Sequence, residues 1–282
     1  MFFKQIIEDK LSQEIINIAS ISGGDINMVY KLTTSEDTCV LKVNTTNSFP
    51  QMFEKEKKGL QSLAETSVKI PKVIQSFEDS GYQFFIIEFI KEEAKRKNFW
   101  ENFAFDLAKI HKAGKDTFGL DYDNYIGSLQ QINTPKNTWK TFFIENRIQP
   151  LIKHAIDLKL LKTDHLKEFE NMFSRFDEIL PKEKPSLVHG DLWSGNLMCG
   201  TGQKPVFIDP AIYFGNREMD IAMTQMFGGF HNSFIDHYND IFPLEKNWED
   251  RIEIYNLYPN LVHLILFGAS YLRGIENVIS KF

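Results

Sequence analysis

The stretch that decides the fold is His189-Gly190-Asp191-Leu192-Trp193-Ser194-Gly195-Asn196, or HGDLWSGN in one-letter code. Asp209 stands thirteen residues after Asn196, at the end of the apolar string VFI and directly before a proline. A short apolar string of this kind indicates a buried strand. Asp191, Asn196 and Asp209 therefore belong to one loop and the strand that follows it, and we expect them to lie close together.

This order and spacing match the catalytic loop of kinases, H-x-D-L-x-x-x-N, which is followed by a strand that ends in a metal-binding Asp. Phosphoryl transfer needs a carboxylate at the acceptor hydroxyl and metal ions that neutralise the phosphates. Asp191 is therefore the candidate catalytic residue. Asn196 and Asp209 offer the oxygen ligands that Mg²⁺ prefers, so both are candidate ligands of Mg²⁺ and ATP. His189 is expected to hold the loop by hydrogen bonds.

Each of these fragments taken alone is more often an ordinary turn or strand end. Their occurrence together and in this order favours the kinase interpretation. Lys42 supplies independent support, because it stands in a strand-like segment with Leu41 and Val43 on the opposite face. A lysine in such a strand is usually an edge residue, but in kinases it pairs with the phosphates of ATP and with a Glu of the next helix.

The helix expected over residues 49–64 offers three candidates for that Glu: Glu54, Glu56 and, at its end, Glu65. At 100° per residue, its apolar residues form a stripe that includes the position of Glu56, whereas Glu54 falls on the far side. A carboxylate on a buried face is costly unless it is paired. We therefore predict an ion pair between Lys42 and Glu56.

Two further segments are expected to bind the nucleotide. Gly23 and Gly24 precede the strand pair that leads to Lys42, and adjacent glycines let backbone N–H groups approach phosphates. On their own they would indicate a turn equally well. Glu88 and Ile90 follow the strongest strand of the sequence, YQFFIIEFI, and their backbone is expected to meet the adenine edge.

The coarse organisation agrees with this interpretation. Residues 29–33, 38–43 and 82–90 are typical of strands, whereas helical periodicity recurs over residues 142–161, 166–180 and 252–279. These patterns predict an α+β, protein-kinase-like fold with two lobes. Residues 1–90 would form a small antiparallel-sheet lobe with one helix, which binds the nucleotide. Residues 91–282 would form a larger, mostly helical lobe with the catalytic loop, the metal site and the acceptor site.

Composition narrows the possible partners and location. The 282 residues carry a formal net charge of −6, which argues against a protein whose main partner is nucleic acid. Two cysteines are too few for a disulfide framework and fit a reducing compartment. The sequence begins without a signal-peptide pattern, and its longest late apolar stretch is too short to span a membrane. We therefore expect a cytoplasmic protein without a membrane partner.

With these residues in place, the chain resembles the fructosamine kinase family, or ketosamine-3-kinases, within the aminoglycoside-phosphotransferase-like kinases. The resemblance covers nearly the whole chain. It rests on HGDLWSGN and on segments such as FGLD at 118–121, NTW at 137–139 and IDPA at 208–211. It implies transfer of the ATP γ-phosphate, with Mg²⁺, to the sugar 3-hydroxyl of a ketosamine, a deglycation activity.

The resemblance also implies roles for single residues. Trp193 would stack on the sugar, although it would otherwise be an ordinary core aromatic. By similarity to kinases in general, Asp220 would hydrogen-bond the backbone of the catalytic loop as a structural residue. Some members of the family carry a cysteine in the glycine loop where this chain has Asp25, so no redox switch is expected there.

Two other functions fit the common motifs. The first is a phosphotransferase for another small alcohol, such as an aminoglycoside or choline. The second is a catalytically inactive nucleotide-binding module. The retention of the motif residues argues against it; these are Lys42, Glu56, Asp191, Asn196 and Asp209. The residues leave open whether the sugar is fructose, ribulose or erythrulose, and whether the amine belongs to a protein or to a free metabolite.

Overall fold

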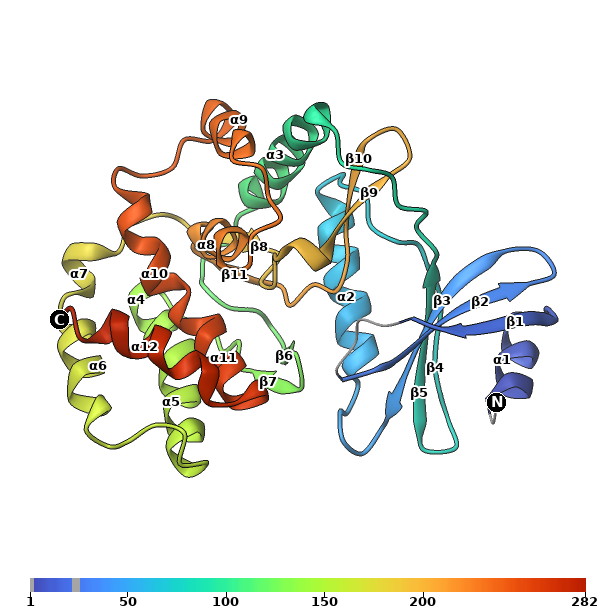
Figure 1. Cartoon of the computed structure of the whole chain (residues 1–282), viewed down its shortest axis with the longest axis horizontal. Coiled ribbons are helices and arrows are strands. Elements are labelled where there is room, and N and C mark those ends of the chain that lie inside the picture. The colour runs from blue at the N-terminus through green and yellow to red at the C-terminus, as the bar shows by residue number, and fades with distance from the viewer. Residues whose placement is uncertain (1–2, 22–25) are drawn as a thin grey trace.

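A five-stranded antiparallel sheet dominates the N-terminal lobe of the computed structural model, which describes residues 3–21 and 26–282 (Figure 1). Its strand order is β1-β2-β3-β5-β4, so the strand with Lys42 lies at the centre. The strands are β1 (Ile15–Ser20), β2 (Met28–Thr34), β3 (Thr38–Thr45), β4 (Val73–Asp79) and β5 (Tyr82–Glu88).

The two faces of this sheet are covered by different helices. In β5, Phe84 packs with Ile7 of α1 (Lys4–Leu11) in one apolar cluster, whereas Phe85 packs with Leu60 of α2 (Met52–Glu65) in another. Successive side chains of a strand point to opposite faces, so an unbroken apolar run can serve both clusters. The strand predicted over residues 82–90 is therefore buried on both sides. The helix α1 was not anticipated from the sequence.

The second lobe is mostly helical and lies to the left in Figure 1. Two large apolar clusters hold it together, one around α3 and one around the last helices. Its longer helices are α3 (Lys97–Lys112), α5 (Gln149–Asp157), α6 (His165–Ser174), α8 (Glu218–Met226), α9 (Ser233–Ile241), α11 (Leu257–Phe267) and α12 (Leu272–Ile279). This lobe also contains short strands: β6 (Asn124–Ile126), β7 (Leu129–Gln131), β8 (Ser186–Val188), β9 (Leu197–Gly200), β10 (Lys204–Phe207) and β11 (Tyr213–Gly215).

Short helical pieces complete this lobe, and they show that the predicted periodic stretches are not continuous helices. They are α4 (Trp139–Phe142), η1 (Phe143–Ile148), α7 (Phe176–Ile179), η2 (Ser194–Asn196), η3 (Trp248–Arg251), α10 (Ile252–Tyr255) and η4 (Ala269–Tyr271). The stretch 252–279 is interrupted at Gly268, whose φ of 91° is incompatible with a right-handed helix. Apolar periodicity alone does not reveal such a break.

Contacts between the lobes place α2 against the segment that follows β10. A Cβ on Gly59 would lie 3.2 Å from the ring of Pro210, so the helix backbone approaches the residue after Asp209 closely. The backbone N–H of Phe207 donates to the carbonyl of Lys69 at 3.1 Å. Glu56 is one turn before Gly59 and is thereby directed toward Asp209.

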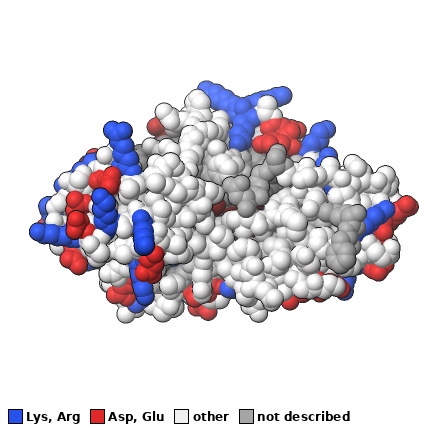
Figure 2. All heavy atoms as spheres, turned by 60° about the horizontal axis from the view of Figure 1, so that its bottom comes forward, with Lys and Arg blue, Asp and Glu red and all other residues white. Residues whose placement is uncertain are grey.

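The surface shows how charge is distributed. On the face in Figure 2, charged side chains of both signs lie toward the two ends and along the upper and lower edges, and the described residues in the middle are largely uncharged. Among the helices of the described residues, none is long and apolar enough to cross a membrane.

Candidate active site

A cavity of about 890 Å³ is lined by residues of both lobes and contains most of the motif residues. Lys42 lies at its N-terminal side, buried on β3 opposite Phe85 of β5. Its Nζ donates to Glu56 Oε1 at 2.6 Å and to Asp209 Oδ1 at 2.5 Å. Lys42 thus connects β3 and α2 with Asp209, which follows β10 in the other lobe.

The electrostatics of this group follow from burial and charge. Burial alone lowers the pKa of Lys42, but the charges of Asp209 and Glu56 outweigh it and hold the pKa above its usual range. Burial also raises the pKa of Glu56. The predicted ion pair between Lys42 and Glu56 is present, and Glu54 instead binds the Ser76 hydroxyl near the surface. The helical phase inferred from the apolar stripe was therefore right.

The HGDLWSGN segment, residues 189–196, which we call the catalytic loop after its motif, follows β8 and ends with η2. Asn196 donates its Nδ2 to the backbone carbonyl of Asp191 and to Asp191 Oδ2, both at 2.9 Å. Burial, and next to it the charge of Asp209, raises the pKa of Asp191 to about 7. The carboxyl group that the sequence assigns to the acceptor hydroxyl is thus a proton acceptor whose pKa lies near neutrality.

His189 and Asp220 hold this loop from beneath. The ring of His189 is fully buried, with Nε2 3.0 Å from the carbonyl of Ile208 and Nδ1 accepting from the N–H of Asp191 at 3.3 Å. Asp220 accepts from the N–H groups of His189 and Gly190 at 2.7 and 2.9 Å. The hydrogen bonds expected of both residues are therefore present.

Gly190 is required by the path of the loop. Its φ is +82°, and a Cβ would lie 2.1 Å from the carbonyl oxygen of Ala211. A side chain at this position would collide with the backbone that follows Asp209. Gly190 therefore lets the catalytic loop pass directly against the backbone of Ala211.

The oxygen atoms of Asn196 and Asp209 have the character that a magnesium site needs. Because Asn196 uses its Nδ2 to hold Asp191, its Oδ1 remains for another partner. The Asp209 carboxylate is 44% exposed, and both residues line the cavity. Among the described residues, no group of three His, Cys, Asp or Glu side chains could hold a metal ion. The amide and carboxylate oxygens of Asn196 and Asp209 fit a hard cation, which would take further ligands from phosphate and water.

Trp193 projects into the cavity and is 38% exposed, so it is not a core residue. Its indole lies over Gly195, where a Cβ would be 2.2 Å from a ring carbon. Its edge meets Phe227 at a centroid distance of 6.3 Å. The ring is thus held flat against the catalytic loop, two residues from Asp191.

The remaining nucleotide candidates differ in how far the structure describes them. The N–H of Glu88 donates to the carbonyl of Lys72 at 2.8 Å, so an adenine contact by Glu88 would have to use its own carbonyl. Ile90 lines the cavity. Gly23 and Gly24 lie outside the described residues.

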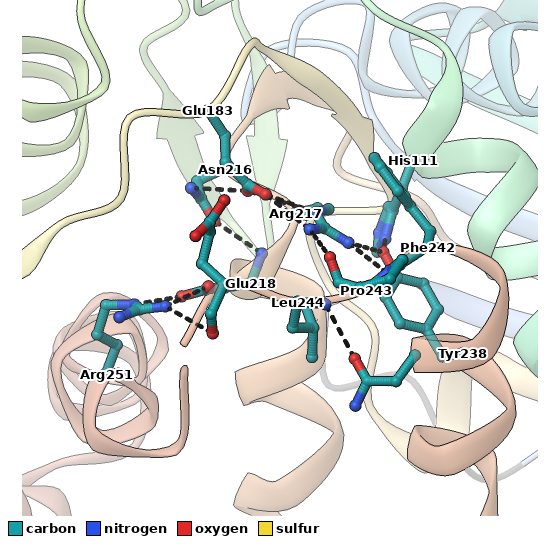
Figure 3. Close-up of polar contacts among 12 residues, drawn as sticks. His111, Glu183, Asn216, Arg217, Glu218, Tyr238, Phe242, Pro243, Leu244 and Arg251 are labelled. Atoms are coloured by element: carbon teal, nitrogen blue, oxygen red, sulfur yellow. Dashed lines mark hydrogen bonds and ion pairs between the residues drawn. The ribbon is translucent and has the colours of Figure 1, made fainter. Parts of the chain in front are cut away.

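The sequence did not reveal the buried polar network behind Asp220, part of which is drawn in Figure 3. His111 of α3 places Nε2 3.1 Å from Asp220 Oδ2 and Nδ1 2.7 Å from the Tyr238 hydroxyl. Arg217 contacts the same hydroxyl at 3.2 Å and is paired with Glu183 at 2.6 Å. A histidine at the buried end of an amphipathic helix is a signal in the sequence, but its two partners, Asp220 and Tyr238, come from α8 and α9.

The order of donors in this network can be worked out. A carboxylate only accepts, so Nε2 of His111 carries the proton that faces Asp220. Nδ1 then accepts from the hydroxyl of Tyr238, whose oxygen accepts from Arg217. Burial lowers the pKa of His111, which keeps the ring neutral. The ion pair of Arg217 is thus connected through two rings to the carboxylate that supports the catalytic loop.

Comparisons with known proteins identify the family to which the chain belongs. The family model described as fructosamine kinase matches residues 2–282. A probable ketoamine kinase of Enterococcus faecium is 36% identical over 285 residues, covering 100% of both chains. The chloroplastic protein-ribulosamine 3-kinase of Arabidopsis thaliana is 34% identical, covering 98% of this chain and 86% of its own. The crystal structure of a candidate fructosamine-3-kinase from Thermobifida fusca has a TM-score of 0.89 at 29% identity, covering 98% of this chain and 96% of that one.

The fold and the family together define a kinase of protein-kinase-like architecture, which uses ATP and has an alcohol as phosphate acceptor. Within this class, the chain belongs to the fructosamine kinase family.

Proposed function

We propose that the chain transfers the γ-phosphate of ATP to the sugar 3-hydroxyl of a ketosamine. One observation carries the proposal: Asp191, Asn196, Asp209 and the Lys42–Glu56 pair line a single cavity in a chain of this family. The relatives named as ketoamine and protein-ribulosamine kinases support the choice of acceptor. A 3-phosphorylated ketosamine is unstable and releases its amine, so the activity is deglycation.

In this proposal, Asp191 orients the acceptor hydroxyl and takes its proton as the phosphate is transferred. Burial supports this role, because it raises the pKa of Asp191 to about 7 and makes the carboxylate a better base than an exposed one. Lys42, held by Glu56, binds phosphate oxygens of ATP. His189 and Asp220 keep the loop in place.

Asn196 and Asp209 would hold Mg²⁺, which neutralises charge on the phosphates when it is bound. Replacing Asp209 by Ala removes the exposed carboxylate of this donor set. We expect calorimetry of ATP binding to show a strong gain from Mg²⁺ for the natural protein and little gain for Asp209→Ala. An unchanged gain would assign the metal to another residue.

Trp193 is proposed as the platform for the sugar. An indole offers the largest flat apolar face among side chains, and this one lies in the cavity close to Asp191. Trp193→Ala should lower kcat/KM for the ketosamine about 10- to 100-fold, which corresponds to ~1–3 kcal/mol. The KM for ATP and the melting temperature should change little. Equal losses for both substrates together with a less stable fold would make Trp193 a packing residue.

The proposed acceptor is tested by offering the enzyme a panel of alcohols with radiolabelled ATP. The panel contains fructosamines, ribulosamines and erythrulosamines, and, as alternatives, choline and several aminoglycosides. We expect label to be transferred to at least one ketosamine with the highest kcat/KM of the panel. Transfer to choline or an aminoglycoside alone would replace the proposed acceptor, and ATP binding without any transfer would indicate an inactive module.

A further inference from the structure

A row of aromatic side chains extends the cavity beyond Trp193. Its members are Trp193, Phe227, His263, Phe267 and Tyr271, and all five line the same cavity as Asp191. They come from the catalytic loop, the end of α8, α11 and η4. We call this set the aromatic row. The inference that follows concerns what it binds, and it rests on the proposed function.

Ring contacts connect the row from end to end. Phe227 meets Trp193 at 6.3 Å and His263 at 5.1 Å between centroids, in both cases edge to face. His263 then stacks on Phe267 at 5.3 Å and on Tyr271 at 5.0 Å. The row is therefore one continuous aromatic surface that starts two residues from the catalytic Asp191.

The row is exposed to a degree unusual for such residues. Trp193, Phe227 and Phe267 keep 38%, 43% and 47% of their surface exposed, although the chain has large apolar clusters that could bury them. Three exposed aromatics from separate elements that face one cavity mark a binding surface rather than leftover core.

The structure also fixes the position of the first rings. The indole of Trp193 rests on Gly195, and Gly229 lies so close to Ser194 that a Cβ on it would be 2.6 Å from the Ser194 Cβ. The segment after Phe227 is thus packed on the catalytic loop. This packing holds Trp193 and Phe227 in place relative to Asp191.

The acidic side chains that line the cavity lie outside the aromatic row, and several of them are already paired. Among the described lining carboxylates, Glu56 pairs with Lys42, Glu88 pairs with Lys69, and Asp220 accepts from the catalytic loop. Asp191 and Asp209 belong to the reaction centre, and Glu92 lies in the connector after β5. None of these carboxylates belongs to the aromatic row.

His263 adds no positive charge to the row. Burial lowers its pKa, so the ring is neutral near pH 7. Its Nδ1 lies 2.7 Å from the carbonyl of Pro259, which can only accept, so Nδ1 carries the proton. Nε2 is then an acceptor, and the row carries no charged group: it presents π-faces, this lone pair, the indole N–H of Trp193 and the hydroxyl of Tyr271.

A ketosamine has a second recognisable group besides its sugar: a secondary amine, which is a cation at neutral pH. We propose that the aromatic row binds this ammonium group through cation–π contacts, while the sugar lies between Trp193 and Asp191. Aromatic faces are the alternative to a carboxylate for holding an alkylammonium ion, and they also cover its apolar substituent. The acceptors selected by this site are therefore cationic ketosamines.

The test compares two acceptors that differ in charge at this nitrogen. One is a fructosamine of a simple alkylamine, and the other is the N-acetyl derivative of the same compound, whose amide nitrogen is neutral. The natural protein should show a kcat/KM about tenfold or more higher for the amine. Phe227→Leu and Phe267→Leu should each lower kcat/KM for the amine about 3- to 30-fold. Both variants should stay within twofold for the acetylated acceptor and for ATP.

Phe105→Leu is the matched control. Phe105 of α3 is 52% exposed and has a lysine over its ring, but it does not line the cavity. This variant should behave as the natural protein with both acceptors. A loss as large as that of Phe227→Leu would show that the effect is not specific to the row, which would overturn the proposal.

A competition experiment on the natural protein avoids dependence on variants. Tetramethylammonium should inhibit competitively against the amine acceptor and not against ATP, whereas tert-butanol, a neutral molecule of similar shape, should inhibit far less. Equal inhibition by both, or equal losses for both acceptors in the leucine variants, would reduce the row to an apolar contact and overturn the cation–π assignment. Failure of the natural protein to phosphorylate either acceptor would instead contradict the proposed function itself, and the ammonium site with it.

Discussion

The surroundings of Asp191 set the chemistry at the scale of single residues. Its carboxyl group is buried, held by Asn196 Nδ2 at 2.9 Å, and has a pKa raised to about 7 by burial and by Asp209. The same environment would be unfavourable for a residue that only supported the fold. A buried carboxylate beside Asn196 and Asp209, the proposed ligands of Mg²⁺, agrees with the action on the acceptor that we propose for Asp191.

Asp191→Asn keeps the shape of the side chain and removes its basicity. We expect kcat to fall about 10²- to 10⁴-fold, the usual contribution of a positioned general base. ATP affinity, measured by calorimetry, should remain within about threefold. Steady-state turnover within threefold of the natural enzyme would contradict the role of Asp191.

Glu56 and Glu54 form a matched pair of acidic residues on one helix. Glu56→Gln removes the charge that holds Lys42, so the KM for ATP should rise about tenfold, equivalent to the ~1.4 kcal/mol of one charge-assisted hydrogen bond. Glu54→Gln changes a residue that bonds Ser76 near the surface and should leave the KM within twofold. Similar values for the two variants would show that the lysine is not positioned by this ion pair.

At the scale of elements, helix phase was predictable and partner choice was not. The apolar stripe of α2 identifies Glu56 because burial follows the 3.6-residue period. Helix α8 gives no such stripe, since Glu218, Asp220 and Thr224 are buried along with its apolar residues. Their partners, among them Arg251 and His111, are remote in the chain, and a local pattern contains no information about them.

The buried polar network that contains His111 of α3 and Tyr238 of α9 should affect the pH dependence of stability. The pKa of His111 is lowered in the fold, so the unfolded chain takes up a proton as pH falls below about 6.5 while the folded chain does not. The stability contributed by the neutral ring is thus present above that pH and lost below it. Gln at this position can still donate to Asp220 and accept from Tyr238, but it does not titrate.

We therefore expect the free energy of unfolding of the natural protein to fall below pH 6.5 relative to His111→Gln, by up to ~1.4 kcal/mol per pH unit. Urea unfolding of both proteins at pH 7.5, 6.5 and 5.5 measures this difference. Parallel pH profiles would show that His111 takes up a proton as readily in the folded as in the unfolded chain, which would contradict its lowered pKa.

For the whole molecule, the order of motifs along the chain predicts the architecture. The residues of each motif can act only if they lie close to those of the others in the folded chain. The strand of Lys42, the helix of Glu56 and the loop of Asp191 could be placed from sequence for this reason. The edge strand β1 and the short helix α1 were missed, since β1 buries a single residue and α1 has only eight. The aromatic row was also missed apart from Trp193, because it is assembled from segments that meet only in the folded chain.

The central claim is transfer of phosphate to the 3-hydroxyl of a ketosamine, and the product itself tests it most directly. The natural enzyme, ATP, Mg²⁺ and a ¹³C-labelled fructosamine are followed by ³¹P and ¹³C NMR. We predict a phosphate ester coupled to C3 of the sugar, its formation abolished by chelation of Mg²⁺, and subsequent release of the free amine. A phosphate on another carbon, or ATP consumption with an unchanged ketosamine, would contradict the account.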